Sequence, residues 1–183
     1  METASSPKAH VDRKVWFSMW FLGAIITFGI AFFPMFYRLV DGRNRHLVHQ
    51  RMLEEKTRDY LRSRGREASQ SRYFKPMNAK LWAASIILII PAFLIMYKLT
   101  RDLALHEHDE DAFLASALPE RVFMPQTIPQ TTYALITIVT LGLGGVYWLY
   151  KLVNLYNAHY KADLQAQKVL AQLTEDEKPV EHM

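Results

Sequence analysis

The residues best suited to chemistry lie in one short run, His106-Glu107-His108-Asp109-Glu110-Asp111. Imidazole and carboxylate groups are typical ligands of zinc or copper, and in an extended loop His106, His108 and Asp111 could reach one ion. A second pair, His46 and His49, is separated by about one helical turn, and both histidines could titrate near neutral pH.

Neither group is expected to form a functional site. His106 also belongs to a repeated motif described below, and a histidine that duplication places in three settings needs no separate role in metal binding. The acidic run fits an external loop, while His46 and His49 fit a solvated helix face. We therefore expect no bound metal, no cofactor and no small-molecule substrate.

The sequence contains none of the common catalytic motifs. The glycines of Gly142-Leu143-Gly144-Gly145 lack the Lys-Ser/Thr that would follow in a phosphate-binding loop, and neither a zinc-protease helix nor a nucleophile elbow is found. The chain has no cysteine, which excludes disulfides, thiolate metal sites and cysteine nucleophiles. We predict that the chain alone is not an enzyme.

Three apolar segments separate the polar groups of this 183-residue chain. A bilayer core about 30 Å thick is crossed by about 20 apolar helical residues. Tryptophan and tyrosine residues lie near the segment ends, where aromatic rings favour the membrane interface. The predicted fold is therefore an all-α integral membrane protein with three transmembrane helices, at residues 15–37, 81–99 and 132–150.

The polar regions complete the predicted organisation. They are a short N-terminal tail at 1–14, a basic cytoplasmic helical connection at 38–80, an acidic outer loop at 100–131, and a helical C-terminal tail at 151–183 with a disordered end. The first and third spans are expected to continue as polar helices, until Gly65 and about Thr174.

The distribution of charge predicts the orientation. The 38–80 connection holds twelve basic and five acidic residues, whereas 98–132 holds three basic and six acidic residues. By the positive-inside rule, the N-terminus lies outside the plasma membrane and the C-terminus in the cytoplasm. Because the topology already explains the basic stretch, no nucleic-acid partner is expected.

A motif occurs three times along the chain. Residues 27–46 align without a gap to residues 140–159, and seven of the twenty aligned pairs are identical. A weaker copy follows the middle segment, and each copy has a histidine nine residues after a tyrosine, which indicates internal duplication. The motif residues are Tyr37, Arg38, Leu39 and His46; Tyr97, Lys98, Leu99 and His106; and Tyr150, Lys151, Leu152 and His159.

The third copy resembles the signature of a known family. Thr140-Leu141-Gly142-Leu143, followed by Trp148 and Tyr150-Lys151, is similar to the domain-of-unknown-function 4234 family of small prokaryotic multi-pass membrane proteins. The first copy departs from that signature at Pro34 and Met35, and the second lacks the glycine. The resemblance implies repeated membrane segments followed by polar helices, and it implies no activity.

With three spans, the polar tail after the middle segment lies on the opposite side of the membrane from the other two polar tails. An alternative arrangement places all three on the same side. The three apolar segments would form re-entrant wedges, broken at Gly29, Pro91 and Gly142–Gly145, with all polar tails on one side. Such breaks are tolerated at membrane depth only where protein shields the backbone.

Small residues at four-residue spacing indicate helix packing. Gly23, Thr27 and Ala31 recur in the first apolar segment, and Thr140 and Gly144 in the third. We therefore predict a non-catalytic scaffold or accessory subunit whose partners are membrane lipids and either another integral membrane protein or a second copy. The alternatives are an oligomeric pore or transport component, and an accessory subunit of a respiratory or metal-dependent membrane enzyme complex.

Overall fold

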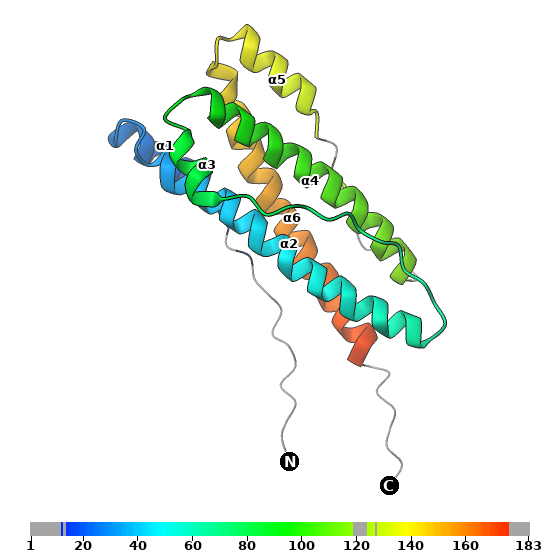
Figure 1. Ribbon diagram of the computed structural model, residues 1–183. Coiled ribbons are helices and arrows are strands. Elements are labelled where there is room, and N and C mark those ends of the chain that lie inside the picture. Colours follow the sequence, from blue (N-terminus) through cyan, green and yellow to red (C-terminus); the bar gives the residue numbers. More distant parts are fainter. Residues whose placement is uncertain (1–11, 13, 119–123, 127, 176–183) are drawn as a thin grey trace, which may run out of the picture.

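The computed structural model describes residues 12, 14–118, 124–126 and 128–175 (Figure 1). These residues form six helices and no strand, so the all-helical part of the prediction holds. The predicted disordered end after residue 175 and most of the 1–14 tail lie outside the described residues. The helices are α1 (Phe17–Ile26), α2 (Phe32–Ser63), α3 (Ala79–Ser85), α4 (Ile90–Ala117), α5 (Gln130–Val139) and α6 (Leu143–Glu175).

Each apolar segment is divided into a short and a long helix by a sharp turn. The pairs are α1 with α2, α3 with α4, and α5 with α6. Over the described part of the chain, no helix is both long enough and apolar enough to cross a bilayer. The predicted transmembrane helices at 15–37, 81–99 and 132–150 are therefore wrong, and so are the multi-pass topology and the plasma-membrane orientation derived from them.

The first and third turns have the same backbone structure. Phe28 and Leu141 have φ values of 51° and 50°, and the glycines that follow have φ values of 91° and 98°. The amide of Gly29 donates to the carbonyl of Ala24 at 2.7 Å, and that of Gly142 donates to Thr137 at 2.8 Å. These six-to-one bonds with left-handed residues end α1 and α5 as Schellman-type caps.

A threonine in each of these turns joins the two helices. The hydroxyl of Thr27 donates to the carbonyl of Gly23 at 2.7 Å and accepts from the amide of Ala31 at 3.0 Å. Thr140 makes the equivalent bonds to Ile136 and Gly144, at 2.7 and 2.6 Å. The small residues that we interpreted as one packing face therefore lie at the turns.

Proline accounts for the middle break. Pro91 stands at the start of α4, where an absent amide hydrogen leaves no intrahelical bond unmade. Farther inside a helix its ring would clash with a carbonyl in the preceding turn, so α3 cannot run on through this position. All three turns lie near the positions that the wedge alternative named, Gly29, Pro91 and Gly142.

The long helices α2, α4 and α6 run in the same direction and pack lengthwise, with the three turns at one end of the bundle (Figure 1). Equivalent positions of the three repeats are buried together. In α2 the buried positions 36, 39, 43, 46 and 50 alternate in steps of three and four, the spacing of a parallel coiled coil. Four successive layers are Leu39, Leu99 and Leu152; Arg43, Leu103 and Tyr156; His46, His106 and His159; and Gln50, Glu110 and Asp163.

This arrangement corrects the predicted acidic outer loop at 100–131. Residues 100–117 are the second half of α4 and pack against the polar halves of α2 and α6. Leu61, Phe113 and Leu170 form an apolar cluster at the end of the bundle away from the turns. The polar extensions therefore lie together, because each apolar segment turns back on itself before its polar helix begins.

Asparagines of the repeat fix the segments that enter the short helices. The side chain of Asn157 accepts from the amide of Val15 at 3.0 Å and donates to its carbonyl at 2.7 Å. Asn44 makes the same pair of bonds to Met77, at 3.0 and 2.7 Å. The third repeat thus holds the start of the first, and the first holds the start of the second, so these bonds link the three repeats in series.

The tight third turn yields a stability prediction. A Cβ added at Gly144 would lie 2.7 Å from Cγ2 of Ile136 and 2.9 Å from its backbone carbonyl carbon. We expect Gly144→Ala to lower the free energy of unfolding by about 1–3 kcal/mol, measured by chemical denaturation. The control is Gly23→Ala in the first repeat, where the added Cβ would be 3.4 Å from that of Ala31. Equal destabilisation by the two changes would contradict this account of the turn.

Candidate metal centre

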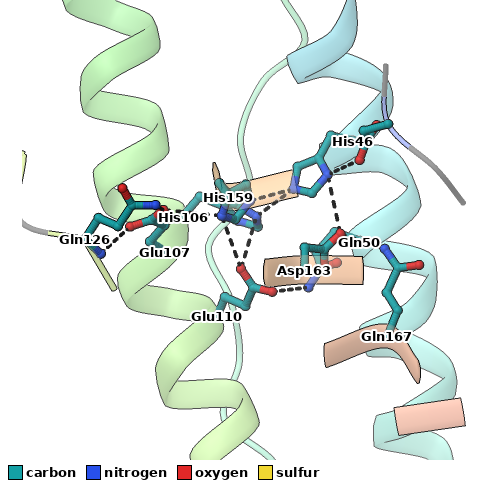
Figure 2. Close-up of polar contacts among 10 residues, drawn as sticks. His46, Gln50, His106, Glu107, Glu110, Gln126, His159, Asp163 and Gln167 are labelled. Atoms are coloured by element: carbon teal, nitrogen blue, oxygen red, sulfur yellow. Dashed lines mark hydrogen bonds and ion pairs between the residues drawn. The ribbon is translucent and has the colours of Figure 1, made fainter. Parts of the chain in front are cut away.

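Three histidines, one from each long helix, meet on the axis of the bundle (Figure 2). Nε2 of His46 lies 3.2 Å from Nε2 of His106 and 2.9 Å from Nε2 of His159. The three rings meet edge to face, with centroids 4.9–5.2 Å apart. All three residues are buried, and we refer to them as the histidine layer.

Carboxylates face the outer nitrogens of two of these rings. Nδ1 of His46 lies 2.8 Å from an oxygen of Asp12 and 3.8 Å from one of Asp163. Nδ1 of His159 lies 3.4 Å from Glu107 and 3.8 Å from Glu110. A carboxylate at Nδ1 holds the proton there and directs the Nε2 lone pair inward, as in carboxylate–histidine–metal arrangements.

The geometry therefore brings acceptor nitrogens together. Two neutral imidazoles with their protons at Nδ1 direct two Nε2 lone pairs at each other across 2.9 Å, which requires a proton or another cation between them. Burial lowers the pKa of His159, and burial together with the neighbouring histidines lowers that of His106 well below its usual range. A metal ion between the rings would accept these lone pairs, which is the coordination that imidazole gives to zinc.

A second polar layer lies one turn of helix beyond the histidine layer, on the side away from the three turns that join the short and long helices. Gln50 donates to Glu110 at 3.4 Å, and Gln167 donates to Asp163 at 2.6 Å. An oxygen of Glu110 also lies 3.9 Å from Nε2 of His106. Burial, followed by the nearby carboxylates of Asp163, Glu107 and Glu54, raises the pKa of Glu110 well above its usual range. A cation in the histidine layer would offset this crowding of negative charge.

The remaining surroundings hold the centre in place. Glu107 accepts from the amide of Gln126 at 2.6 Å. Phe74 packs edge to face on His106 and also lies under the guanidinium of Arg43, which pairs with Asp102 at 2.6 Å. These contacts fix the rotamers around the histidine layer from three sides of the bundle.

The two histidines and the aspartate that the sequence suggested as ligands of one metal ion lie apart from one another in this structure. His106 lies in the histidine layer, whereas His108 is exposed and Asp111 is only partly buried, since residues two apart on α4 point to different faces. His49 lies outside the layer. His46 and His159 carried the repeat signal but were not recognised as ligands, and the roles of Asp12, Glu107 and Asp163 were missed.

Comparisons of the chain with protein-family models, with curated proteins and with solved structures find no match. The resemblance of the third repeat to the domain-of-unknown-function 4234 family accordingly stays a prediction. The interpretation of the histidine layer rests on its geometry.

Glu54, one turn beyond the second polar layer, gives a prediction on pH dependence. Burial raises its pKa from 4.5, against the opposing effects of Ser71 and Arg58. Because the folded chain keeps this proton to higher pH than the unfolded chain, Glu54 lowers the free energy of unfolding as the pH rises above about 4.5. Glu54→Gln should therefore be more stable than the parent chain at pH 7, and the difference should shrink as the pH falls toward 4.

Chemical denaturation across this pH range measures the effect. The matched control is Glu55→Gln, because Glu55 is exposed and pairs with Arg51 along the helix surface. A difference at pH 7 that persists unchanged at low pH would contradict the assignment to Glu54 ionisation.

Proposed function

We propose that this chain binds one divalent transition-metal ion through Nε2 of His46, His106 and His159, and that this ion is zinc. The observation that carries the proposal is the approach of three Nε2 atoms from three different helices to 2.9 and 3.2 Å. The ligand atoms of the layer all lie within 4.8 Å of one another.

The dimensions agree with zinc coordination. Zn–N bonds of about 2.0–2.1 Å in a tetrahedron place neighbouring nitrogens about 3.3 Å apart. The separations in the histidine layer are slightly shorter, so small outward movements of the rings would admit the ion. Glu110 lies close enough to supply an oxygen as a fourth ligand after a change of rotamer, and its approach would complete a three-nitrogen, one-oxygen set.

The donor set limits the choice of metal. Imidazole nitrogens suit Zn²⁺, Cu²⁺, Ni²⁺, Co²⁺ and Fe²⁺, and a chain without cysteine offers no thiolate for softer ions. The surrounding carboxylates Asp12, Glu107, Glu110 and Asp163 favour a doubly charged ion over a singly charged one.

The burial of the centre supports a holding role rather than catalysis by this chain. The cavity that adjoins His46 and His106 has a volume of about 10 Å³, close to the space of a single water molecule. An ion there would link α2, α4 and α6 and stabilise the native bundle. We therefore retain the proposal of a non-catalytic accessory protein, now with a metal as its resident ligand.

A second candidate draws on a different observation. A cleft of about 800 Å³ lies between α2 and the 70–76 segment, and His106 forms part of its wall. A small molecule in this cleft would approach the metal from one side, which fits an accessory subunit of a metal-dependent enzyme complex. The pore or transport alternative stays a prediction without a supporting observation.

Metal analysis of purified protein tests the proposal. We expect about one zinc ion per chain, and His46→Gln or His159→Gln should reduce metal affinity at least about tenfold, because each removes a ligand. Metal in about hundredfold excess over its Kd adds about 2.7 kcal/mol to the free energy of unfolding, so a chelator should lower the Tm of the parent chain more than that of these variants.

His108→Gln is the matched control, since His108 lies two residues from His106 on the same helix but is exposed. It should keep the full metal content and the chelator response. Equal metal content in all variants, or no metal binding by the parent chain, would refute the three-histidine site.

A further inference from the structure

The end of the bundle that carries the three turns presents large apolar side chains to the surroundings. Phe28 is 98% exposed and Leu141 is 95% exposed, and the second turn is lined by exposed aliphatic residues. Six representative members of this surface, which we call the apolar tips, are Ile26, Phe28, Ile30, Ile89, Leu141 and Leu143. This many exposed apolar groups at one end of a small molecule mark an interaction site.

The backbone of the tips directs these residues outward. Phe28 and Leu141 both occupy the left-handed region, at φ of 51° and 50°, which bulky side chains rarely adopt. Asparagine or aspartate would fit that conformation with less strain and would suit water better. Two apolar residues at equivalent strained positions therefore point to an apolar environment around the tips.

Cations stacked on aromatic rings surround the base of the tips. The cations occupy equivalent positions of the three repeats, one on each long helix. In each pair, the guanidinium carbon or ammonium nitrogen lies 5.5–5.8 Å from the centroid of an aromatic ring. Such pairs of aromatic and basic side chains are typical of the boundary between hydrocarbon and headgroups. The pairs are Arg38 with Trp20, Lys98 with Trp82, and Lys151 with Tyr147.

The depth of the tips matches one half of a bilayer. Nine residues separate Phe28 from Tyr37, and the same number separates Leu141 from Tyr150. At 1.5 Å per helical residue this is at most about 13 Å, because the first few residues belong to the turns, so the tips fit within one half of a hydrocarbon core about 30 Å thick.

In the first and third turns, backbone groups that the helices leave free are bonded internally, which suits an apolar medium. Gly29 and Gly142 donate to carbonyls of the preceding helices, and the hydroxyls of Thr27 and Thr140 accept the next free amides. A turn whose polar groups bond internally avoids the cost of unsatisfied hydrogen bonds in lipid.

We propose that the three apolar tips insert into a single leaflet of a lipid bilayer, with the cation–aromatic ring at the headgroups and the histidine layer on the aqueous side. Each turn enters and leaves on the same face, so none of the helices in the described part of the chain crosses the membrane. The cations Arg38, Lys98 and Lys151 favour anionic headgroups. The inference is independent of metal binding, because the tips and the histidine layer lie at different heights of the bundle and share no residue.

Flotation with vesicles tests the insertion. The probes are vesicles of phosphatidylcholine, with and without phosphatidylglycerol, and the variant combines Phe28→Asp with Leu141→Asp. Both sites are almost fully exposed and left-handed, so aspartate should leave the fold intact, which circular dichroism checks. We expect the parent chain to float, more strongly with phosphatidylglycerol, and the variant to bind at least about tenfold more weakly.

Val48→Asp is the matched control, since Val48 is an exposed apolar residue on the polar half of α2. It adds one negative charge away from the tips, where the double variant adds two at the tips, and it should float like the parent chain. Equal flotation of the double variant and the parent would overturn the proposal. Failure of the parent chain to bind either kind of vesicle would also overturn the proposal. In that case a dimer in buffer that the double variant lacks would show that the tips join two copies of the chain instead.

Discussion

The structure depends on the register with which α2, α4 and α6 pack around a common axis. If any one of these helices shifted by one residue, a buried polar side chain would turn toward solvent. The histidine of that helix would then no longer meet the other two histidines. The same register places apolar layers near the turns, histidines at mid-height and carboxylates beyond them. One packing arrangement thus determines both the core and the candidate metal centre.

The turns help to set this register. Phe28, Leu88 and Leu141 each stand eighteen residues before a histidine of the layer, so the number of residues from turn to histidine is the same in all three repeats. If the three turns lie at one level, the three histidines also lie at one level and on equivalent faces. The asparagine bonds to Val15 and Met77 then hold neighbouring repeats at matching heights.

Several of these features could be predicted from the sequence. The repeat was visible because Thr27, Tyr37, Leu39 and His46 keep their spacing, and helix-forming sequence extends close to the ends at Ser63 and Glu175. The transmembrane prediction was wrong because hydropathy sums side chains and does not register where the backbone must turn, at Gly29, Pro91 and Gly142. The meeting of the three histidines was missed because the repeated histidine was taken as a mark of ancestry alone. Neighbours from distant segments, such as Asp12, carry no local signal.

X-ray absorption at the edge of the bound metal tests the central claim most directly, because it reports the atoms around the ion. The account predicts three imidazole nitrogens at about 2.0 Å, with the multiple scattering of the rings, and one oxygen in the same shell. A shell made of oxygens alone, or one with fewer than three imidazoles, would show that the ion lies elsewhere and would contradict the meeting of the three repeats on one metal.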